Sequence, residues 1–343
     1  MRVGVLGLGF MGSTHLQAWA KVPEAQVMAV MSRNEKRLSG DLSDVGGNLS
    51  IPGAGMDFSG YRKYRSVEQV LIDRDVDAVD ICLPTYLHEE VATAALQHGK
   101  HVLVEKPMAL DGAAAERVAA AAEKHTRVLM VAHVLRFFPE YAGLVELVRS
   151  GRLGRVRSAI FRRRTAVPTW GEWEFDRTKS GGGVFDLLIH DVDIALQLFG
   201  LPTAISAVGH ENLRGGVDSI TAQFFCREAD AVTITGGWHH RGAYSFSMEY
   251  TVLADNGVVE FSSDGKPATV YWKDETSERL PAQDVDPFTA ELSYFIECCQ
   301  SGQQPLRCSP HDSALAVWAA KAMVDARGEN GAKVEFRAQA TGS

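Results

Sequence analysis

The first 132 residues alternate short apolar runs with stretches that have helical periodicity. The apolar runs are rich in Val, Ile and Leu without strict alternation, which is typical of parallel strands covered on both faces. The predicted strands are Val3–Leu6, Val27–Met31, Val76–Leu83, His101–Val104 and Arg127–Ala132. The predicted helices are Met11–Ala20, Asn34–Val45, Val67–Asp73, His88–His98 and Gly112–His125, and the stretch Gly46–Tyr64 is expected to be a loop or insertion. This pattern predicts a doubly wound α/β domain with a parallel sheet.

The second half has a different pattern, in which β-branched and aromatic runs dominate. Hairpin-like turns such as Ala254–Gly257 separate several of the runs, so we expect a large, mostly antiparallel open sheet. Its predicted strands are Val156–Arg164, Ala204–Glu211, Ser219–Phe225, Ala231–Trp238, Phe246–Ala254, Gly257–Phe261 and Thr269–Trp272. Helices are predicted at Pro139–Ser150, Gly183–Phe199, Thr289–Ser301 and His311–Arg327, which makes this half an α+β domain.

The chain has 343 residues, which is enough for two domains at about 100–200 residues each. We place the α/β domain at residues 1–132 and the α+β domain at residues 133–343. Lys and Arg total 35 against 43 Asp and Glu, so the formal net charge of −8 argues against nucleic acid or an anionic membrane as the main partner.

No apolar run approaches the length of a membrane span, and the five cysteines show no disulfide or zinc-ligand spacing. We therefore expect free thiols in a cytoplasmic protein without a metal site.

A glycine-rich motif follows the first predicted strand directly and opens the first predicted helix. Its sequence, Gly7-Leu8-Gly9-Phe10-Met11-Gly12, fits the dinucleotide-binding pattern G-x-G-x-x-G. The first glycine permits a tight turn, the second lets a pyrophosphate approach the backbone, and the third lets the helix pack on the strand. The helix N-terminus adds N–H donors and the positive end of the helix dipole. The motif therefore predicts a nicotinamide dinucleotide site.

The end of the second predicted strand bears on the choice of dinucleotide. NAD-binding chains usually have a carboxylate there for the ribose 2′-hydroxyl, whereas Arg favours the 2′-phosphate of NADP. This chain has Ser32 and Arg33, with Arg37 one helical turn further on, and no carboxylate at the strand end. We expect NADP to be preferred over NAD, and the alternative is that Arg33 is only a solvated side chain.

Two further strand ends carry residues that we expect at the cofactor, because ligands of open parallel sheets bind at the carboxyl ends of the strands. Glu105 and Lys106 stand before Pro107 at one of them, and an ammonium group there can polarise a hydroxyl or carbonyl oxygen. Pro84-Thr85 and His88 close the other strand end and are predicted to face the cofactor.

A buried polar stripe is predicted on the helix that follows Ser180–Gly183. Asp186, His190, Asp193 and Gln197 fall at i, i+4, i+7 and i+11, on one face of a helix that is otherwise apolar. A carboxylate and an imidazole at one-turn spacing can orient each other for proton transfer. The alternative is a structural network of satisfied polar groups, or for Asp186 a helix-dipole partner.

Other polar and aromatic residues are weaker candidates for substrate binding. His133 and Arg136 follow the last strand of the first domain, although Arg136 can equally tie the two domains together. A set of aromatic and histidine side chains in the second half could form a sugar-stacking wall or could pack in the core. We include one of them, Trp173, among the substrate residues. The members of the set are Trp170, Trp173, Trp238, His239 and His240.

Taken in order along essentially the whole chain, these motifs resemble the glucose–fructose oxidoreductase, inositol dehydrogenase and rhizopine catabolism family, written Gfo/Idh/MocA. The motifs that carry the resemblance are Gly7–Gly12, Pro84-Thr85-Tyr86-Leu87-His88, Glu105-Lys106-Pro107, Arg136-Phe137, and Ser180–Gly183 continued through Asp186 and His190 to Asp193.

The resemblance implies hydride transfer between a nicotinamide and a secondary alcohol of a sugar, cyclitol or derivative. By matching position, His190 is the implied general base, Asp186 orients it and holds a neighbouring substrate hydroxyl, and Lys106 binds the reacting oxygen. Ser32 stands where many NAD-using relatives have Asp. The family also implies dimers or tetramers formed through the open sheet of the second domain.

Two other function classes compete with a dehydrogenase. Some proteins of this resemblance use tightly bound NAD for redox-assisted glycoside cleavage, which requires turnover without net formation of NADH. A cofactor-binding sensor without catalysis is the other, but a sensor needs only the cofactor glycines and has no use for Lys106, Asp186 and His190 together.

Overall fold

The computed structural model describes residues 1–343 except 47–54, 169–170, 241, 282–285 and 339–343. Two compact units form within the chain. The first comprises residues 1–134, 169–171 and 285–314, and the second comprises residues 135–168, 172–284 and 315–343. The predicted division at residue 132 assigns 285–314 to the second domain, whereas the structure packs this segment with the first unit.

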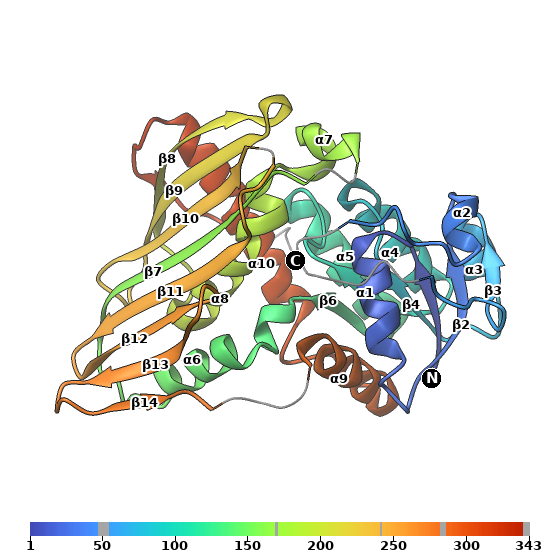
Figure 1. The fold of residues 1–343 in the computed structure, drawn as a ribbon, viewed down its shortest axis with the longest axis horizontal. Helices are drawn as coiled ribbons and strands as arrows, with labels where there is room; N and C mark the ends of the chain where they lie inside the picture. Colours follow the sequence, from blue (N-terminus) through green and yellow to red (C-terminus); the bar gives the residue numbers. More distant parts are fainter. Residues whose placement is uncertain (47–54, 169–170, 241, 282–285, 339–343) are drawn as a thin grey trace. The chain divides into compact units, whose positions relative to one another are not determined.

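The first unit is built on a six-stranded parallel sheet with strand order β3-β2-β1-β4-β5-β6 (Figure 1). This is the order of a dinucleotide-binding Rossmann fold, and it reverses between β1 and β4. The strands are β1 (Arg2–Leu6), β2 (Gln26–Met31), β3 (Arg62–Tyr64), β4 (Ala78–Ile81), β5 (His101–Glu105) and β6 (Leu129–Ala132). The apolar side chains of β1, β4, β5 and β6 are buried, as the continuous apolar runs predict.

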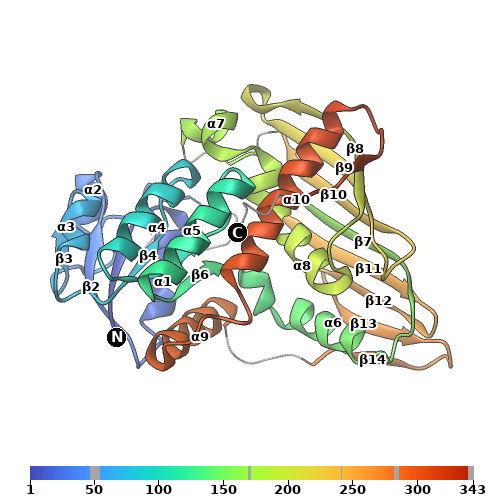
Figure 2. The same ribbon diagram turned by 180° about the vertical axis from the view of Figure 1, so that it is seen from behind.

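Helices cover both faces of this sheet (Figures 1 and 2). They are α1 (Phe10–Trp19), α2 (Glu35–Leu38), α3 (Val67–Leu71), α4 (His88–Gln97), α5 (Gly112–His125) and α9 (Pro287–Ser301), with 3₁₀ turns η1 (Thr85–Leu87) and η2 (Val134–Arg136), the latter at the division between the units. The alanine-rich α5 begins at Asp111, whose side chain accepts a hydrogen bond from Ala114 N. A capping box of Ser66 and Gln69 begins α3.

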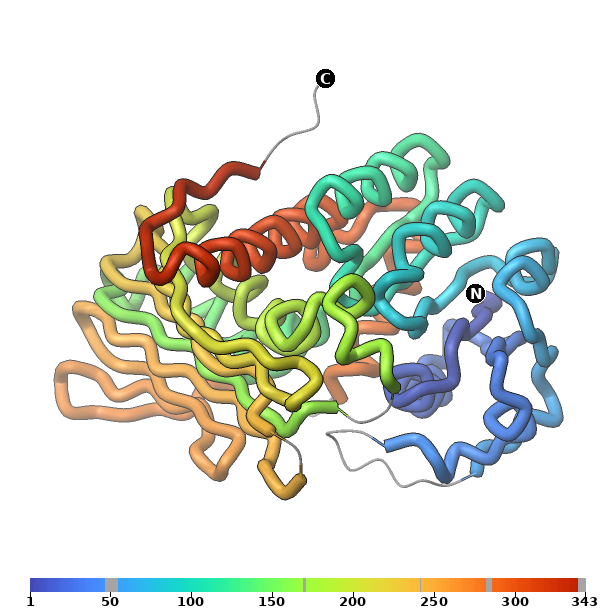
Figure 3. The backbone as a smooth tube through the Cα atoms, turned by 90° about the horizontal axis from the view of Figure 1, so that it is seen from above, coloured from blue at the N-terminus to red at the C-terminus, as the bar shows by residue number. Residues whose placement is uncertain are grey.

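The second unit is built on a nine-stranded sheet in the order β14-β13-β12-β11-β7-β10-β9-β8-β15. All its strand pairs are antiparallel except β7 with β10, which confirms the predicted α+β class. The strands are β7 (Val156–Thr165), β8 (Ala204–Asn212), β9 (Val217–Phe225), β10 (Val232–His239), β11 (Ser247–Ala254), β12 (Gly257–Ser262), β13 (Lys266–Trp272), β14 (Ser277–Arg279) and β15 (Val334–Glu335). β15 returns the chain to the sheet edge beside β8 (Figure 3).

One face of this sheet carries the helices of the second unit, and the opposite face carries none of the labelled helices (Figures 1 and 2). The helices are α6 (Pro139–Arg149), α8 (Ile189–Phe199) and α10 (Pro310–Gly328, which begins in the first unit), and shorter turns are η3 (Glu172–Phe175), α7 (Arg177–Ser180) and η5 (Leu213–Gly215). Exposed apolar side chains of the sheet include Ile160, Val208, Leu253 and Tyr271. They stand among ion pairs such as Arg157 with Asp255.

The predicted single helix Gly183–Phe199 is wrong in its first turn. Residues Val184–Leu188 form a wider π-helical turn, η4, and the α-helix α8 begins only at Ile189. Gly181 and Gly182 before it adopt positive φ of 76° and 78°. The π turn changes the register of Asp186 relative to His190, so the one-face spacing predicted for a regular helix does not hold across this junction.

The other differences lie at short or edge elements. The predicted helix Asn34–Val45 is reduced to α2, which Asn34 begins by accepting a hydrogen bond from Arg37 N. The predicted loop Gly46–Tyr64 ends in the edge strand β3, and its residues 47–54 lie outside the described part of the chain. The edge strands β14 and β15 have too few apolar residues for a sequence pattern to show.

Candidate functional site

The glycine loop between β1 and α1 has the backbone that a dinucleotide needs. Gly7 has φ of +101°, and a Cβ on it would lie 2.4 Å from Cys82 O. A Cβ on Gly12 would lie 1.9 Å from Gly7 O, so the helix packs on the strand as the motif predicts. A Cβ on Gly9 would meet Arg37 Nη1 at 4.0 Å. The side of Gly9 is therefore open to a pyrophosphate, and the residues present fit a nicotinamide dinucleotide.

The residues after β2 include two arginines with different settings, Arg33 and Arg37. Ser32 is buried, and its hydroxyl accepts a hydrogen bond from Asn34 N at 3.1 Å. Arg33 is exposed and makes no hydrogen bond within the described part of the chain. Arg37 is half-buried, with its guanidinium paired to Asp44 at 3.0 Å and 3.4 Å from Leu8 O. Arg37 thus borders the glycine loop, while Arg33 has its full charge available.

The residues at the carboxyl ends of β4 and β5 are held together by His88. Its Nδ1 lies 2.7 Å from Pro107 O and its Nε2 lies 2.7 Å from Leu83 O. Burial lowers the pKa of His88, partly offset by these two carbonyl contacts. When the ring is neutral, it donates a hydrogen bond to one of these carbonyls. When it is protonated, it donates to both. His88, predicted as a cofactor residue, is therefore a buried clamp between the two strand ends.

Glu105 and Lys106 follow β5 as predicted, and the peptide bond between Lys106 and Pro107 is cis. Lys106 is half-buried, and its backbone N–H donates to Glu105 Oε2 at 3.1 Å. The Glu105 carboxylate is itself buried. Glu105 therefore acts on Lys106 through the backbone and positions it.

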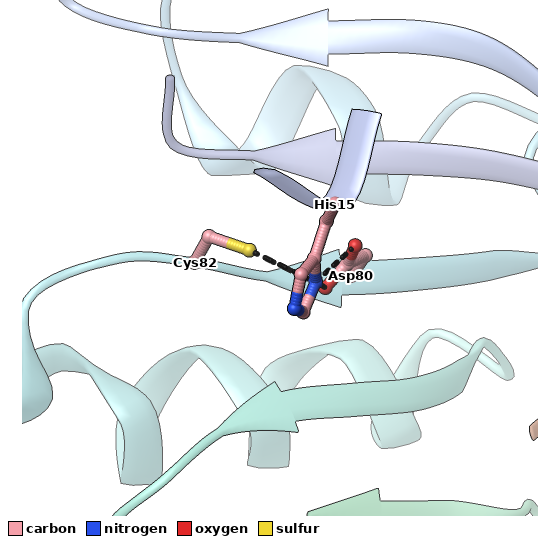
Figure 4. A group of neighbouring side chains, drawn as sticks. All are labelled: His15, Asp80 and Cys82. Carbon is pink, nitrogen blue, oxygen red and sulfur yellow. Dashed lines mark hydrogen bonds and ion pairs between the residues drawn. The ribbon is translucent and has the colours of Figure 1, made fainter. Parts of the chain in front are cut away.

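A buried charge network, missed by the sequence analysis, lies beneath these strand ends (Figure 4). His15 of α1 places Nδ1 3.0 Å from Asp80 Oδ2 and Nε2 3.1 Å from Glu105 Oε1. The contact between Nδ1 and Asp80 is a hydrogen bond. The contact between Nε2 and Glu105 is an ion pair without hydrogen-bond geometry. Trp19 Nε1 donates to Asp80 Oδ2 at 2.8 Å. One imidazole thus links the glycine-loop helix to β4 and β5.

The charge state of His15 follows from this geometry. Burial acts to lower its pKa, but the charge of Asp80 and the hydrogen bond to it outweigh burial and raise the pKa well above its ordinary value. His15 is thus an imidazolium between two carboxylates. Cys82 Sγ lies 3.5 Å from His15 Nδ1, so one ligand atom from each of His15, Asp80 and Cys82 falls within 4.8 Å of the others (Figure 4). Hydrogen bonds account for this proximity.

A fourth acid, Glu291 of α9, is fully buried near the same network, and neither carboxyl oxygen has a hydrogen-bond partner. Burial raises the pKa of Glu291 well above its ordinary value, and the charges of Glu105 and Asp80 add to this effect, while His15 opposes it. This shift favours the neutral form of the Glu291 carboxyl group. The helix that carries Glu291, α9, packs against α1 of the first unit.

In the second unit, Asp218 fixes the glycines before Asp186. Asp218 Oδ2 accepts a hydrogen bond from Gly183 N at 2.7 Å, and a Cβ on Gly182 would lie 2.5 Å from the same oxygen. Asp186, half-buried in the π turn, accepts a hydrogen bond from Trp238 Nε1 at 3.2 Å. Trp238, one of the suggested sugar-stacking residues, is fully buried and serves instead as a core partner of Asp186.

The other acids of this helix are structural. Asp193 is bound by Arg136, with Nε 2.9 Å from Oδ2, and by Gln197 Nε2 at 3.2 Å. Asp191 forms a second buried pair with Arg163, 2.8 Å from Nε to Oδ2. Arg136, predicted to bind substrate, thus places its charge on Asp193 inside the second unit. His190 lies half-buried on α8, directly before Asp191.

Glu174 of η3 is another residue that the sequence analysis missed. It is 2% exposed, and neither of its carboxyl oxygens has a hydrogen-bond partner. Burial, together with the charge of Asp186, raises the pKa of Glu174 to about 9. Nothing in its local pattern, Glu-Trp-Glu-Phe, distinguishes it from its exposed neighbour Glu172.

The remaining predicted residues have varied settings. Phe10, Met11 and Pro84 are half-buried beside the cofactor motifs, Thr85 is buried in η1, and His133 is buried after β6. Trp173 is half-buried in η3, and Trp170 lies outside the described residues. His239 ends β10 and His240 follows it, and the His239 ring is tilted against Tyr244 with 5.2 Å between ring centroids.

Two general findings concern the described residues. None of their helices combines the length and apolar character needed to cross a membrane. The five cysteines, all among them, form no disulfide.

Comparison with known proteins identifies the family. A family model described as oxidoreductase family, NAD-binding Rossmann fold, matches residues 1–133, and the GFO/IDH/MocA C-terminal domain model matches residues 141–260. The chain belongs to the GFO/IDH/MocA family. The predicted resemblance and fold class are confirmed, and the protein is an oxidoreductase.

Several GFO/IDH/MocA relatives align over most of the chain. Myo-inositol 2-dehydrogenase of Thermotoga maritima is 26% identical over 92% of this chain and 93% of its own length. The 1,5-anhydro-D-fructose reductase of Ensifer adhaerens is 28% identical over 89% of this chain and 90% of its own. Among solved structures, levoglucosan dehydrogenase in complex with NADH and levoglucosan has a TM-score of 0.82 at 20% identity, covering 98% of this chain and 99% of that one, which is a likeness of fold.

Proposed function

We propose that this GFO/IDH/MocA oxidoreductase transfers hydride between a nicotinamide dinucleotide and a secondary alcohol or ketone of a sugar, cyclitol or derivative. The observation that carries the proposal is the open side of Gly9 in a Rossmann sheet, followed by Glu105-Lys106 at the carboxyl end of β5. The names of the relatives, which act on inositol and on anhydrosugars, support the substrate class.

The proposed chemistry divides among three side chains. His190 accepts the proton of the reacting hydroxyl group, and Asp186, held by Trp238, orients the imidazole and binds a neighbouring substrate hydroxyl. Lys106 binds the reacting oxygen and stabilises the charge that develops on it. The nicotinamide, when bound, supplies the hydride acceptor or donor.

The proposed cofactor is NADP in preference to NAD. The support is the free guanidinium of Arg33 at the end of β2 and the absence of a carboxylate from Ser32-Arg33. A guanidinium binds the 2′-phosphate with charge-assisted hydrogen bonds, which the 2′-hydroxyl of NAD cannot match. Against it stands the family model's description, which names NAD.

Substituting Arg33 tests this preference. We expect Arg33→Ala to weaken NADPH binding about 10- to 100-fold, the range of a lost charge-assisted contact, and NADH binding by less than about threefold. Titration of nicotinamide fluorescence with cofactor-free protein measures both dissociation constants. Arg74→Ala removes an exposed charge before the amino end of β4 and serves as the control. Equal losses for the two cofactors would rule out the 2′-phosphate contact.

We also propose that a second copy of this chain covers the open sheet of the second unit. Four exposed apolar side chains on that sheet, Ile160, Val208, Leu253 and Tyr271, support this proposal. Light scattering of the purified protein distinguishes a monomer from a dimer or tetramer.

We further propose that the protein is cytoplasmic. Five cysteines without a disulfide support this location, because thiols stay reduced in the cytoplasm.

The activity itself is tested by incubating the protein with NAD or NADP and a panel that includes myo-inositol and levoglucosan. Formation of reduced nicotinamide, followed by its absorbance, supports the proposal. Turnover of a glycoside with retained cofactor and no net reduction would replace it by redox-assisted cleavage. Cofactor binding without any turnover would leave a sensor as the better description.

A further inference from the structure

Glu174 is a buried acid of the second unit, and among the described residues its carboxyl group has no hydrogen-bond partner. Its side chain is 2% exposed, and both oxygens lack a hydrogen-bond partner. Burying a polar group in this way costs about 1–3 kcal/mol or more. An unsatisfied buried group therefore calls for an explanation.

The neighbouring buried acids of the same unit show what a structural role looks like. Asp191 is paired with Arg163, Asp193 with Arg136, and Asp218 accepts from Gly183 N. Each of these carboxylates binds one part of the fold to another. Glu174 binds nothing with its side chain, so stability alone does not explain its presence.

Hydrogen bonds tie the backbone of Glu174 to the turn that carries Asp186. Ser180 Oγ donates to Glu174 O at 2.7 Å and accepts from Gly182 N at 3.0 Å, and Gly182 O in turn accepts from Asp186 N at 3.0 Å. Asp186 is also the charged side chain that acts on the Glu174 carboxyl group. The two acids therefore share one environment, and η3 holds Glu174 at the residue proposed to bind a substrate hydroxyl.

We propose that Glu174 is a substrate-binding residue, whose neutral carboxyl group donates a hydrogen bond to a hydroxyl oxygen of an uncharged polyol held at Asp186. The inference rests on the proposed function and narrows its substrate class. An anionic sugar, such as a uronic acid or a sugar phosphate with its charge at this position, would be repelled by Asp186. Because a protonated carboxyl group carries no charge, Glu174 can be buried without an ion-pair partner.

The proposal fits the protonation state of Glu174. Because its pKa is raised to about 9, the carboxyl group keeps its proton at neutral pH and loses it as the pH rises through that value. Deprotonation removes the donor and adds a second negative charge beside Asp186. We therefore expect KM for the substrate to rise above that pH.

The test compares Glu174→Leu with Glu174→Gln, using the polyol of the panel that the wild type turns over best. The leucine variant removes the hydrogen bond, and we expect KM to rise at least about 10-fold, with kcat changed less and the NADPH and NADH dissociation constants unchanged. Glutamine keeps one donor and one acceptor, so E174Q restores most of the loss and shows no rise of KM at alkaline pH. Glu172→Gln is the same substitution at an exposed position two residues away and is the control.

Each outcome decides a separate question. Leucine and glutamine variants with equally raised KM would show that an ionised carboxylate binds the substrate, which contradicts the neutral donor. Preference for an amino sugar over its hydroxyl counterpart, lost in E174Q, would contradict the uncharged substrate class. A leucine variant with wild-type KM and an undiminished melting temperature would overturn the role of Glu174 alone, whereas a wild type inactive toward every polyol would overturn the proposed function as well.

Discussion

Alanine at His190 or at Lys106 is expected to lower turnover at least about 100-fold, the usual contribution of general acid–base catalysis. The reason is that both side chains are proposed to act on charge that changes during the reaction. His190 receives the hydroxyl proton, and Lys106 stabilises the oxygen that loses it. Both proposed roles lie in the reaction step, so although Lys106 is expected beside the cofactor, we expect the dissociation constant of the dinucleotide to change less than about threefold.

Stopped-flow or steady-state turnover, combined with fluorescence titration of NADPH and NADH, measures the two effects separately. His210→Ala and Lys124→Ala replace exposed residues of the same types and serve as controls. Loss of cofactor binding in H190A to the same extent as loss of turnover would contradict the role of His190 as a base. Retained activity in K106A would remove the oxygen-binding role of Lys106.

The parts of this protein that sequence analysis could predict are those in which local pattern and function coincide. The glycine loop is one, because Gly7, Gly9 and Gly12 each answer a backbone requirement that is visible from spacing alone. The parallel sheet is another, since its buried strands are continuous apolar runs. Glu105-Lys106 follows from the rule that ligands bind at strand carboxyl ends.

What could not be predicted depends on contacts between distant segments. His15, Asp80 and Glu105 lie 25 or more positions apart, and only Asp80 stands as a single acid between apolar neighbours. That isolation was the available signal, but the partners follow only from the sheet order. The first turn of the 183–199 helix was mistaken for regular α-helix, because a π turn leaves no mark in hydrophobic periodicity. Glu174 likewise has no local signal.

The ion pair of Arg136 with Asp193 is another contact between distant segments that the sequence alone does not reveal. A basic residue just after a strand end is a reasonable substrate ligand by position, and only the fold shows that a carboxylate on α8 binds it. Asp191 and Asp193 have arginine partners, and Asp186 and His190 stay the catalytic prediction for this segment.

The buried network around His15 is expected to control the stability of the first unit. Replacing His15 by Leu leaves Asp80 and Glu105 buried without their shared imidazolium, and breaking a buried charge pair in this way costs about 3–5 kcal/mol. Chemical denaturation followed by circular dichroism measures the loss. The control is His98→Leu, an exposed histidine near the end of α4. A loss below about 1 kcal/mol, within the range of surface substitutions, would contradict the network.

The double variant H15L/D80L separates the charge from the packing. It removes one positive and one negative charge, so the net charge acting on Glu105 and Glu291 is unchanged, and we expect it to be less destabilised than H15L and D80L added together. The difference in the free energy of unfolding between the wild type and the double variant should also depend on pH. The pKa of His15 is raised in the folded protein, so its contribution is fully present below the unfolded value of about 6.5 and is lost as the pH rises through the folded value. The stability advantage of the wild type over the double variant should therefore shrink at alkaline pH. Strictly additive losses without pH dependence would show instead that His15 is a packing residue and not the cation that joins α1 to β4 and β5.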